Sequence, residues 1–72
     1  MEIDWDKVPE YNEAVDGLKI VYSKFYGVWA AKHDNTVQEF ESEPELDEYL
    51  INELKLDENA LEQGTIITLK YG

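Results

Sequence analysis

The residues of this chain that could do chemistry are mostly carboxylates. Its 72 residues include 17 Asp and Glu against 6 Lys, with one His and no Cys, and the formal net charge is −11 at pH 7. Acids alternate along residues 39–45 and again at Asp4 and Asp6, and alternate residues of an extended strand share one face. Such pairs can hold a divalent cation weakly, but neither stretch has the spacing of an EF-hand loop. We therefore expect no specific metal site and no cofactor.

Catalytic groups other than carboxylates are few. His33 is the only other candidate for a general base, and it falls in a predicted turn, where a histidine is usually solvated. The two serines are Ser23 and Ser42, and Ser42 is expected to cap a helix. A pair of carboxylates could serve glycosidase chemistry by residue type, but a chain of this size has little room for the enclosing cleft. We expect that the protein is not an enzyme.

The acids fall in two segments that flank a mildly basic, aromatic centre. Residues 1–16 hold six acids and residues 39–62 hold ten, whereas residues 17–38 hold one acid and three lysines. Carboxylates three or four residues apart on a helix lie about 5–6 Å from each other, close to the spacing that would echo a row of phosphates. The acids expected to form such a row are Glu39, Glu41, Glu43, Glu45, Asp47, Glu48, Asp57, Glu58 and Glu62.

A small, strongly acidic domain resembles the DNA-mimic proteins, many of them phage products that block restriction, CRISPR, repair or transcription enzymes. The resemblance rests on size and charge, and it implies an inhibitor that occupies the nucleic-acid-binding groove of a basic protein. Direct binding to nucleic acid or to an anionic membrane is not expected, because both would repel this chain. The lack of cysteine, of a basic leader and of a long apolar run favours the cytoplasm, or the host cytoplasm for a phage-encoded protein.

The alternative is an acidic interaction or accessory module that does not mimic nucleic acid. Trp5 and Tyr11 lie among the acids of the first segment, outside the predicted strands, and exposed aromatic residues often anchor a protein interface. Trp5 could equally close one end of a small core, and the acids could serve solubility alone. We expect a monomer or a weak homodimer, because a charge of −11 per chain opposes the approach of a second copy.

The size and composition predict one folded domain over residues 1–72. The chain is 43% hydrophobic and 12% aromatic, which is too apolar for a disordered acidic chain. The central aromatic residues are expected in the core, with lysines covering the edge strands. These aromatic residues are Tyr22, Phe25, Tyr26 and Trp29, and the lysines are Lys19, Lys24 and Lys32.

A helix beginning at Glu43 is the clearest element. Ser42 is a good N-cap, Glu45 completes a capping box, and Pro44 is tolerated in the first turn. A second short helical turn is expected over residues 57–64, capped by its first residue and ended by its glycine. The apolar stripe of the first helix consists of Leu46, Tyr49, Leu50 and Leu54.

Strands are expected on both sides of this helix. Residues 26–32 and 36–41 have the pattern of a hairpin whose turn is His33, Asp34 and Asn35, and residues 65–72 have that of a β-branched strand inside a sheet. Residues 9–25 are ambiguous: residues 18–22 have the composition of a strand, but a helical stripe also fits, formed by Tyr11, Val15, Leu18, Val21, Tyr22 and Phe25. Gly17 favours the strand, since glycine costs a helix interior about 1 kcal/mol. The sequence thus predicts an α+β domain. It has a small antiparallel sheet of three to four strands and one main helix on one face, in β-β-α-β order over the C-terminal two-thirds.

Overall fold

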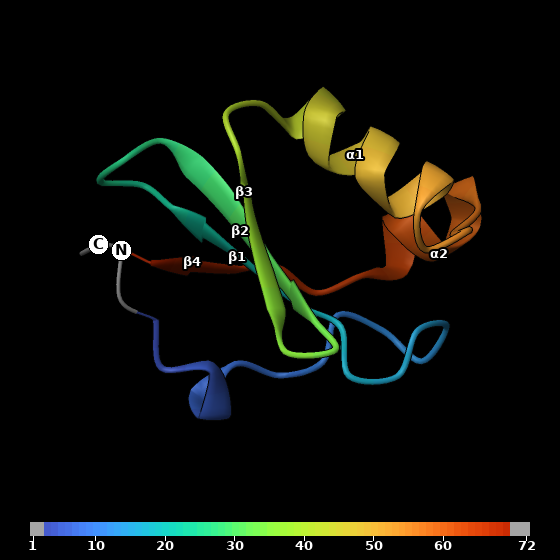
Figure 1. Ribbon diagram of the computed structural model, residues 1–72, viewed down its shortest axis with the longest axis horizontal. Helices are drawn as coiled ribbons and strands as arrows, with labels where there is room; N and C mark the ends of the chain where they lie inside the picture. The colour runs from blue at the N-terminus through green and yellow to red at the C-terminus, as the bar shows by residue number, and fades with distance from the viewer. Residues whose placement is uncertain (1–2, 70–72) are drawn as a thin grey trace.

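A mixed four-stranded sheet carries two helices on one face and the N-terminal segment on the other (Figure 1). The computed structural model describes residues 3–69. The elements in chain order are a 3₁₀ turn at Trp5–Lys7, strands β1 (Lys19–Ser23), β2 (Val28–His33) and β3 (Thr36–Phe40), helices α1 (Glu43–Asn52) and α2 (Glu58–Gln63), and strand β4 (Ile67–Leu69). The predicted α+β class is confirmed. Within the ambiguous stretch 9–25, strand β1 forms at residues 19–23, and the other positions are turns and loop, so the helical stripe does not form.

The first three strands form an antiparallel meander. β1 pairs with β2 in the register that places Lys19 opposite Lys32, and β2 pairs with β3. The predicted hairpin between β2 and β3 is confirmed, and its turn residues Asp34 and Asn35 have φ values of 51° and 63°. Asp and Asn tolerate this left-handed region better than most residues, which allows a two-residue loop to close the hairpin.

Strand β4 departs from the expectation of an internal strand in an antiparallel sheet. It pairs in parallel with β1, with Ile67 opposite Val21, and the order β3-β2-β1-β4 places it at an edge. The connection explains this result, because the chain leaves β3 at one edge, crosses one face through both helices and returns at the other edge. Strands joined by such a helical crossover run in the same direction. The strand was expected to reach Gly72, and residues 70–72 lie outside the described part of the chain.

The N-terminus of α1 is held by the predicted cap, with one variation. The Ser42 hydroxyl accepts a hydrogen bond from the Glu45 backbone nitrogen at 3.4 Å. Glu45 Oε2 accepts from the backbone nitrogen of Glu41 at 3.1 Å, one residue earlier than in the usual capping box. The predicted apolar stripe faces the sheet, where Leu46 and Leu50 are both fully buried.

Helix α2 is capped as expected but ends differently. Asp57 Oδ1 accepts from the Ala60 backbone nitrogen at 2.8 Å. Gly64 follows the helix with a φ of −75°, so it is extended and does not form the left-handed cap typical of glycine. Space is the reason for glycine here, because a Cβ atom at position 64 would overlap the ring of Tyr11.

Two hydrophobic clusters cover the two faces of the sheet. The buried residues on the helical face are Tyr11, Leu18, Ile20, Ala31, Leu46, Leu50 and Leu56. The opposite face buries Val8, Val21 and Ala30, with Ile3, Trp5, Ile67 and Leu69 packed around them. Successive residues of β1 enter different clusters because side chains alternate along a strand. The N-terminal segment therefore forms a second covering layer.

The expectation that four central aromatic residues form the core is wrong for two of them. Tyr22 and Trp29 are partly buried on the helical face of the sheet, with ring centroids 4.5 Å apart. Phe25 and Tyr26 are 70% and 56% exposed. They lie in the turn between β1 and β2, past the end of both strands, where neither covering layer reaches them.

Candidate functional site

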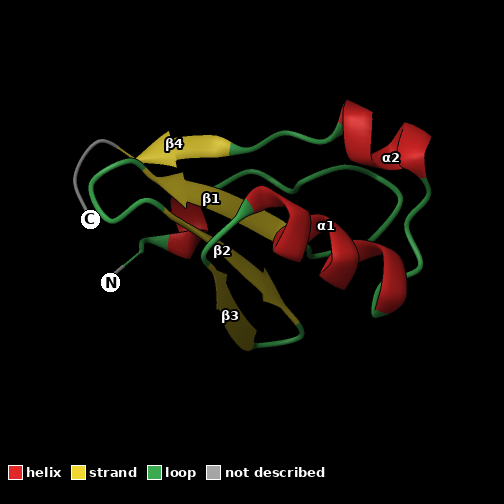
Figure 2. Cartoon of the chain, turned by 90° about the horizontal axis from the view of Figure 1, so that it is seen from above, coloured by secondary structure: helices red, strands yellow, loops and turns green. Residues whose placement is uncertain are grey.

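A groove between α1 and α2 brings together four of the predicted acids. Its volume is about 320 Å³, and the two helices that form its walls lie together at one end of the molecule (Figure 2). The groove is lined by Glu43 and Asp47 of α1, by Glu58, Leu61 and Glu62 of α2, and by Tyr11 and Ile66. The two acids of each helix are four residues apart, so they lie on the same side of that helix. We call this groove the acidic groove, after its four carboxylates Glu43, Asp47, Glu58 and Glu62.

This arrangement of charge has two opposing effects on the helices. Glu43 and Glu58 lie in the first turns of α1 and α2, where the helix dipole favours a negative charge, whereas Asp47 and Glu62 add a second acid four residues later. Like charges four residues apart destabilise an isolated helix by roughly 0.2–0.5 kcal/mol per pair, and each helix carries one such pair. Neither helix has a basic residue in its last turn, and Lys55 is the only basic residue within 43–63. Among the described residues, no ion pair involves an acid of the groove. Within the described residues, no cation is therefore paired with these four carboxylates.

Tyr11 forms the floor of the groove and connects the parts of the structure that build it. The residue is only 3% exposed, and its hydroxyl donates a hydrogen bond to the Leu61 carbonyl at 2.7 Å. Its backbone nitrogen donates to the Leu18 carbonyl, and its carbonyl accepts from the Thr65 nitrogen, each at 2.7 Å. The expectation of a protruding anchor at Tyr11 is wrong, because the fold uses the side chain to hold the N-terminal segment against α2 and β1.

The pKa of Tyr11 is affected by the negative charge of the groove. Burial raises the pKa of the Tyr11 phenol above its ordinary value of 10.0, and the carboxylates of Asp47 and then Glu43 raise this pKa further. Both effects disfavour a new negative charge at the phenol. The same carboxylates favour a positive charge, so an ammonium or guanidinium group is the chemical partner that the groove fits.

The other predicted acids lie outside the groove lining. The exposed acids that cap helices or flank the groove are Glu41, Glu45, Glu48 and Asp57. Glu39 is separated from them by the sheet. It pairs with Ala30, whose side chain belongs to the cluster beneath the N-terminal segment, and directly opposite residues share a face. The predicted row of acids therefore does not extend from β3 into the helices.

Trp5 has a structural role in the core and is not a protruding anchor. It is partly buried and packs with the cluster around Val21 and Ala30, on the face away from the helices. Its carbonyl accepts a hydrogen bond from Lys19 Nζ at 2.7 Å. Trp5 thus closes one end of the core, far from the groove.

Comparisons of the chain with protein-family models, with curated proteins and with solved structures find no match. The functional argument therefore rests on the geometry of this chain. Within residues 3–69, no group of three or more His, Asp or Glu side chains is arranged to hold a metal ion. No helix in this described range is long and apolar enough to cross a membrane.

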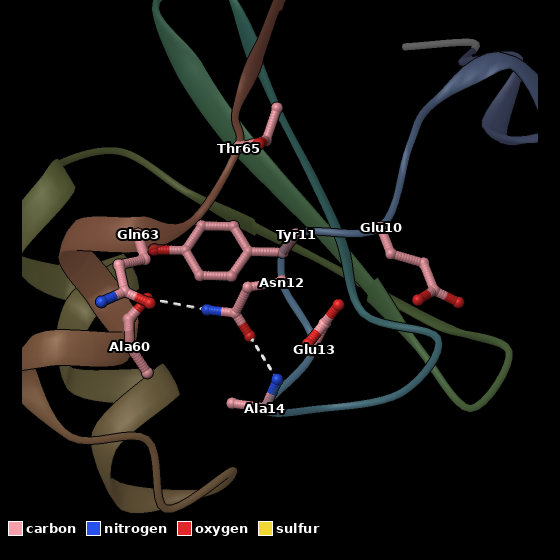
Figure 3. A pocket seen from close by; sticks show the side chains of 8 residues that line it. All are labelled: Glu10, Tyr11, Asn12, Glu13, Ala14, Ala60, Gln63 and Thr65. Atoms are coloured by element: carbon pink, nitrogen blue, oxygen red, sulfur yellow. Dashed lines mark hydrogen bonds between the residues drawn. The ribbon is translucent and has the colours of Figure 1, made fainter.

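A second hollow, of about 390 Å³, also has Tyr11 in its wall (Figure 3). Its other lining residues are Glu10, Asn12, Glu13, Ala14, Ala60, Gln63 and Thr65. Asn12 Nδ2 donates to the Ala60 carbonyl at 2.7 Å, and Asn12 Oδ1 accepts from the Ala14 nitrogen at 2.8 Å. The amide nitrogen of Asn12 thus fastens the N-terminal segment to α2, and its oxygen holds the local turn at Ala14. We assign this hollow to the junction between those two segments.

The apolar part of the acidic groove was missed by sequence reasoning. Leu61 and Ile66 line the groove, and Ile66 is 38% exposed. A partial signal was present, because Leu61 lies between Glu58 and Glu62 at a spacing that places all three on one side of a helix. The contribution of Ile66 depends on how the chain enters β4, which no local pattern indicated.

Proposed function

We propose that this protein is an inhibitor that binds a basic, nucleic-acid-binding protein through the acidic groove and the carboxylates around it. The observation that carries the proposal is one groove with a pair of carboxylates on each wall and no lysine in its lining. Pairs of like charge on a helix lower its stability. The helix dipole favours Glu43 and Glu58 in the first turns but does not account for Asp47 and Glu62, for which a binding role is an explanation.

The shape and chemistry of the groove suit lysine and arginine side chains. Its floor is formed by Tyr11, Leu61 and Ile66, and its walls carry the four carboxylates. Lysine and arginine bury their aliphatic stems on apolar surface while their charged ends remain with polar groups. Arginine can also form two parallel hydrogen bonds to one carboxylate, as it does to a phosphate. The groups that hold nucleic acid in a basic protein would thus be occupied by this protein.

The proposal is tested by charge reversal in two matched sets. The groove variant carries Glu43→Lys, Glu58→Lys and Glu62→Lys, and the control variant carries Asp6→Lys, Asp16→Lys and Glu39→Lys. All six positions are exposed, and the control positions do not line the groove. Proteins captured by the parent chain from a bacterial lysate are then purified, and their affinities for the parent and both variants are measured.

We expect the groove variant to bind at least about tenfold more weakly than the control variant, because charge reversal places like charges opposite each other across the interface, which strongly disfavours binding. Association of the parent should slow steeply as salt rises, since charge complementarity acts mainly on the association rate. Duplex DNA or RNA should displace the parent chain. Equal binding by both variants would contradict a groove-specific interaction, and failure of nucleic acid to compete would contradict mimicry.

A further inference from the structure

The turn between β1 and β2 exposes two adjacent aromatic side chains. Phe25 is 70% exposed and Tyr26 is 56% exposed, the highest values among the large hydrophobic residues of the described chain. Burial of a phenylalanine side chain stabilises a fold, and a domain this small has little stability to spare. Single exposed apolar residues are common, but two neighbouring aromatic residues at the tip of one turn form a concentrated apolar surface.

The backbone beneath these side chains is held by hydrogen bonds from both ends of the turn. Ser23 is fully buried, and its hydroxyl accepts from the Tyr26 nitrogen at 3.2 Å. The Ser23 carbonyl accepts from the Gly27 nitrogen at 2.7 Å, and the Lys24 nitrogen donates to Leu69 of β4 at 2.9 Å. Glycine suits position 27 because its φ is 69°. The turn is therefore fixed before any partner arrives.

The two rings are also arranged relative to each other. The centroids of Phe25 and Tyr26 lie 4.9 Å apart and the rings meet edge to face, at 88°. This is a favoured geometry for an aromatic pair. Side chains that are ordered in advance lose less conformational entropy when they bind, so this pair has the properties of an interface hot spot.

The surroundings of the turn differ from those of the acidic groove. The turn lies at one end of the long axis of the molecule and α2 at the other, as both views show (Figure 1, Figure 2). Lys24 is exposed beside Phe25, and Asp34 is the only acid within residues 17–38. A partner surface can therefore approach this end without meeting the acids of the helices.

We propose that the β1–β2 turn is a second docking element, which inserts Phe25 and Tyr26 into an apolar pocket on a protein partner. A carboxylate at the rim of that pocket would pair with Lys24. The inference does not depend on the acidic groove. An anionic membrane is disfavoured by the net charge of −11. Two aromatic side chains of roughly 150–250 Å² each also fall short of the about 800 Å² per subunit of a stable dimer, which disfavours a second copy meeting turn to turn.

The test uses the full chain with a double substitution, Phe25→Ser and Tyr26→Ser. The matched control is Val37→Ser with Ile51→Ser, which removes two apolar side chains that are 47% and 43% exposed elsewhere on the surface. Each protein is immobilised and exposed to a bacterial lysate in about 0.5 M salt, where the Debye length is about 4 Å and charge-driven capture is suppressed. A third arm uses the groove variant with three reversed charges.

A protein partner of the turn should bind the parent, the control and the groove variant, and bind the turn variant about 30-fold more weakly. A photoreactive phenylalanine at position 25 should then cross-link into an apolar pocket of that captured protein. Thermal unfolding should show the same melting temperature for the turn variant and the parent, because the exposed pair contributes little to the core.

The proposal is overturned if no captured protein distinguishes the turn variant from the control, or if the cross-link maps to a charged surface. It is also overturned if the double substitution instead abolishes binding to phosphatidylcholine vesicles or self-association in sedimentation, which would assign the turn to a lipid surface or to a second copy. Loss of capture by the groove variant alone would contradict independence from the acidic groove.

Discussion

The helical layer of this protein is strongly acidic, whereas the strand meander has slightly more lysines than acids. Residues 43–63 contain eight acids and one lysine, whereas residues 18–40 contain two acids and three lysines. The meander buries side chains on both of its faces, including Ile20, Val21, Ala30 and Ala31. The helices bury one stripe against the sheet and turn their acids outward.

The acids of this fold are concentrated in the helical layer, whereas the meander contributes buried residues to both hydrophobic clusters. The meander is held by strand pairing and by two hydrophobic clusters, and neither relies on charged side chains. The helices hold to the sheet through Leu46 and Leu50 while their exposed carboxylates repel each other. Conditions that change the charge of the protein should therefore act on the helical layer first.

The largest effect that separates the two regions is expected from Leu50→Ala. Leu50 is 1% exposed beneath α1, and such a truncation in a core costs about 2–5 kcal/mol. Ile51→Ala, at a position 43% exposed on the same helix, should change the free energy of unfolding by no more than about 0.5 kcal/mol. Denaturant unfolding measures both values. Equal losses at the two positions would show that the stripe does not anchor α1 to the sheet.

Gly64→Ala should be next in size. The added Cβ would overlap the ring of Tyr11, and the ring is held by the hydroxyl bond to Leu61 and by two backbone bonds. Overpacking of this kind costs about 1–3 kcal/mol. Thr65→Ala, at the exposed neighbouring position, is the control and should be nearly neutral in the same unfolding experiment. If Gly64→Ala leaves the free energy of unfolding unchanged, the Tyr11 ring must be able to move away from the added Cβ without cost.

Tyr11→Phe should cost about 1–2 kcal/mol at neutral pH, because the Leu61 carbonyl loses its donor. The pKa of Tyr11 in the folded state lies above its ordinary value of 10.0, first through burial and then through Asp47 and Glu43. The folded state thus holds the phenol proton more tightly, and this contribution is complete below pH 10 and lost as pH rises through the folded-state pKa.

The gap between the parent and Tyr11→Phe should therefore narrow above pH 10, as followed by melting temperature. The melting temperature of Tyr11→Phe should still fall somewhat at alkaline pH, because burial and then Glu53 and Asp34 raise the pKa of Tyr49 as well. Tyr26→Phe changes a tyrosine that is 56% exposed and should melt like the parent at each pH. A constant gap between parent and Tyr11→Phe across this range would contradict the buried neutral phenol.

The smallest effect is expected from neutralising two acids of the acidic groove. Asp47→Asn with Glu62→Gln relieves both repulsive pairs and keeps Glu43 and Glu58 in the first helical turns, so it should stabilise the protein by roughly 0.4–1 kcal/mol in dilute buffer. Added salt should raise the melting temperature of the parent and remove this advantage. The control neutralises two exposed acids elsewhere, Asp16 and Glu39. An equal gain from both sets would mean that net charge, and not pairing within the helices, sets the effect.

The parts of the fold that could be predicted are those fixed by neighbours in the sequence. The cap of α1 at Ser42 and the turn at Asp34 and Asn35 depend on interactions within a few residues, so their residue types were sufficient. The pairing of β4 with β1 was not predictable in this way, because it depends on a crossover through two helices. The alternation of apolar residues in β4 identifies a strand without saying which partner it has or in which direction it runs.

In the candidate site, too, the features set by local sequence could be predicted and those set by long-range contacts could not. The spacing of Glu43 with Asp47 and of Glu58 with Glu62 follows from each helix alone, and those acids were identified from the sequence. Their meeting across one groove depends on how residues 53–57 place α2 relative to α1. Burial of Tyr11 and the turning of Glu39 to the other face of the sheet depend on long-range contacts and on register, which composition and periodicity do not contain.

The parallel pairing of β4 with β1 also orders events during synthesis. Val21 meets Ile67 only after both helices have been made, and the bond between Tyr11 and Thr65 closes a similarly long stretch of chain. A nascent chain that has emerged from the ribosome only as far as α1 can form the meander but leaves one edge of β1 unpaired, and an open edge invites pairing with other chains. Contacts between residues this far apart form slowly compared with hairpins. The ribosome must therefore release residues 65–69 before this edge is closed, and the nascent protein is most prone to aggregate until then.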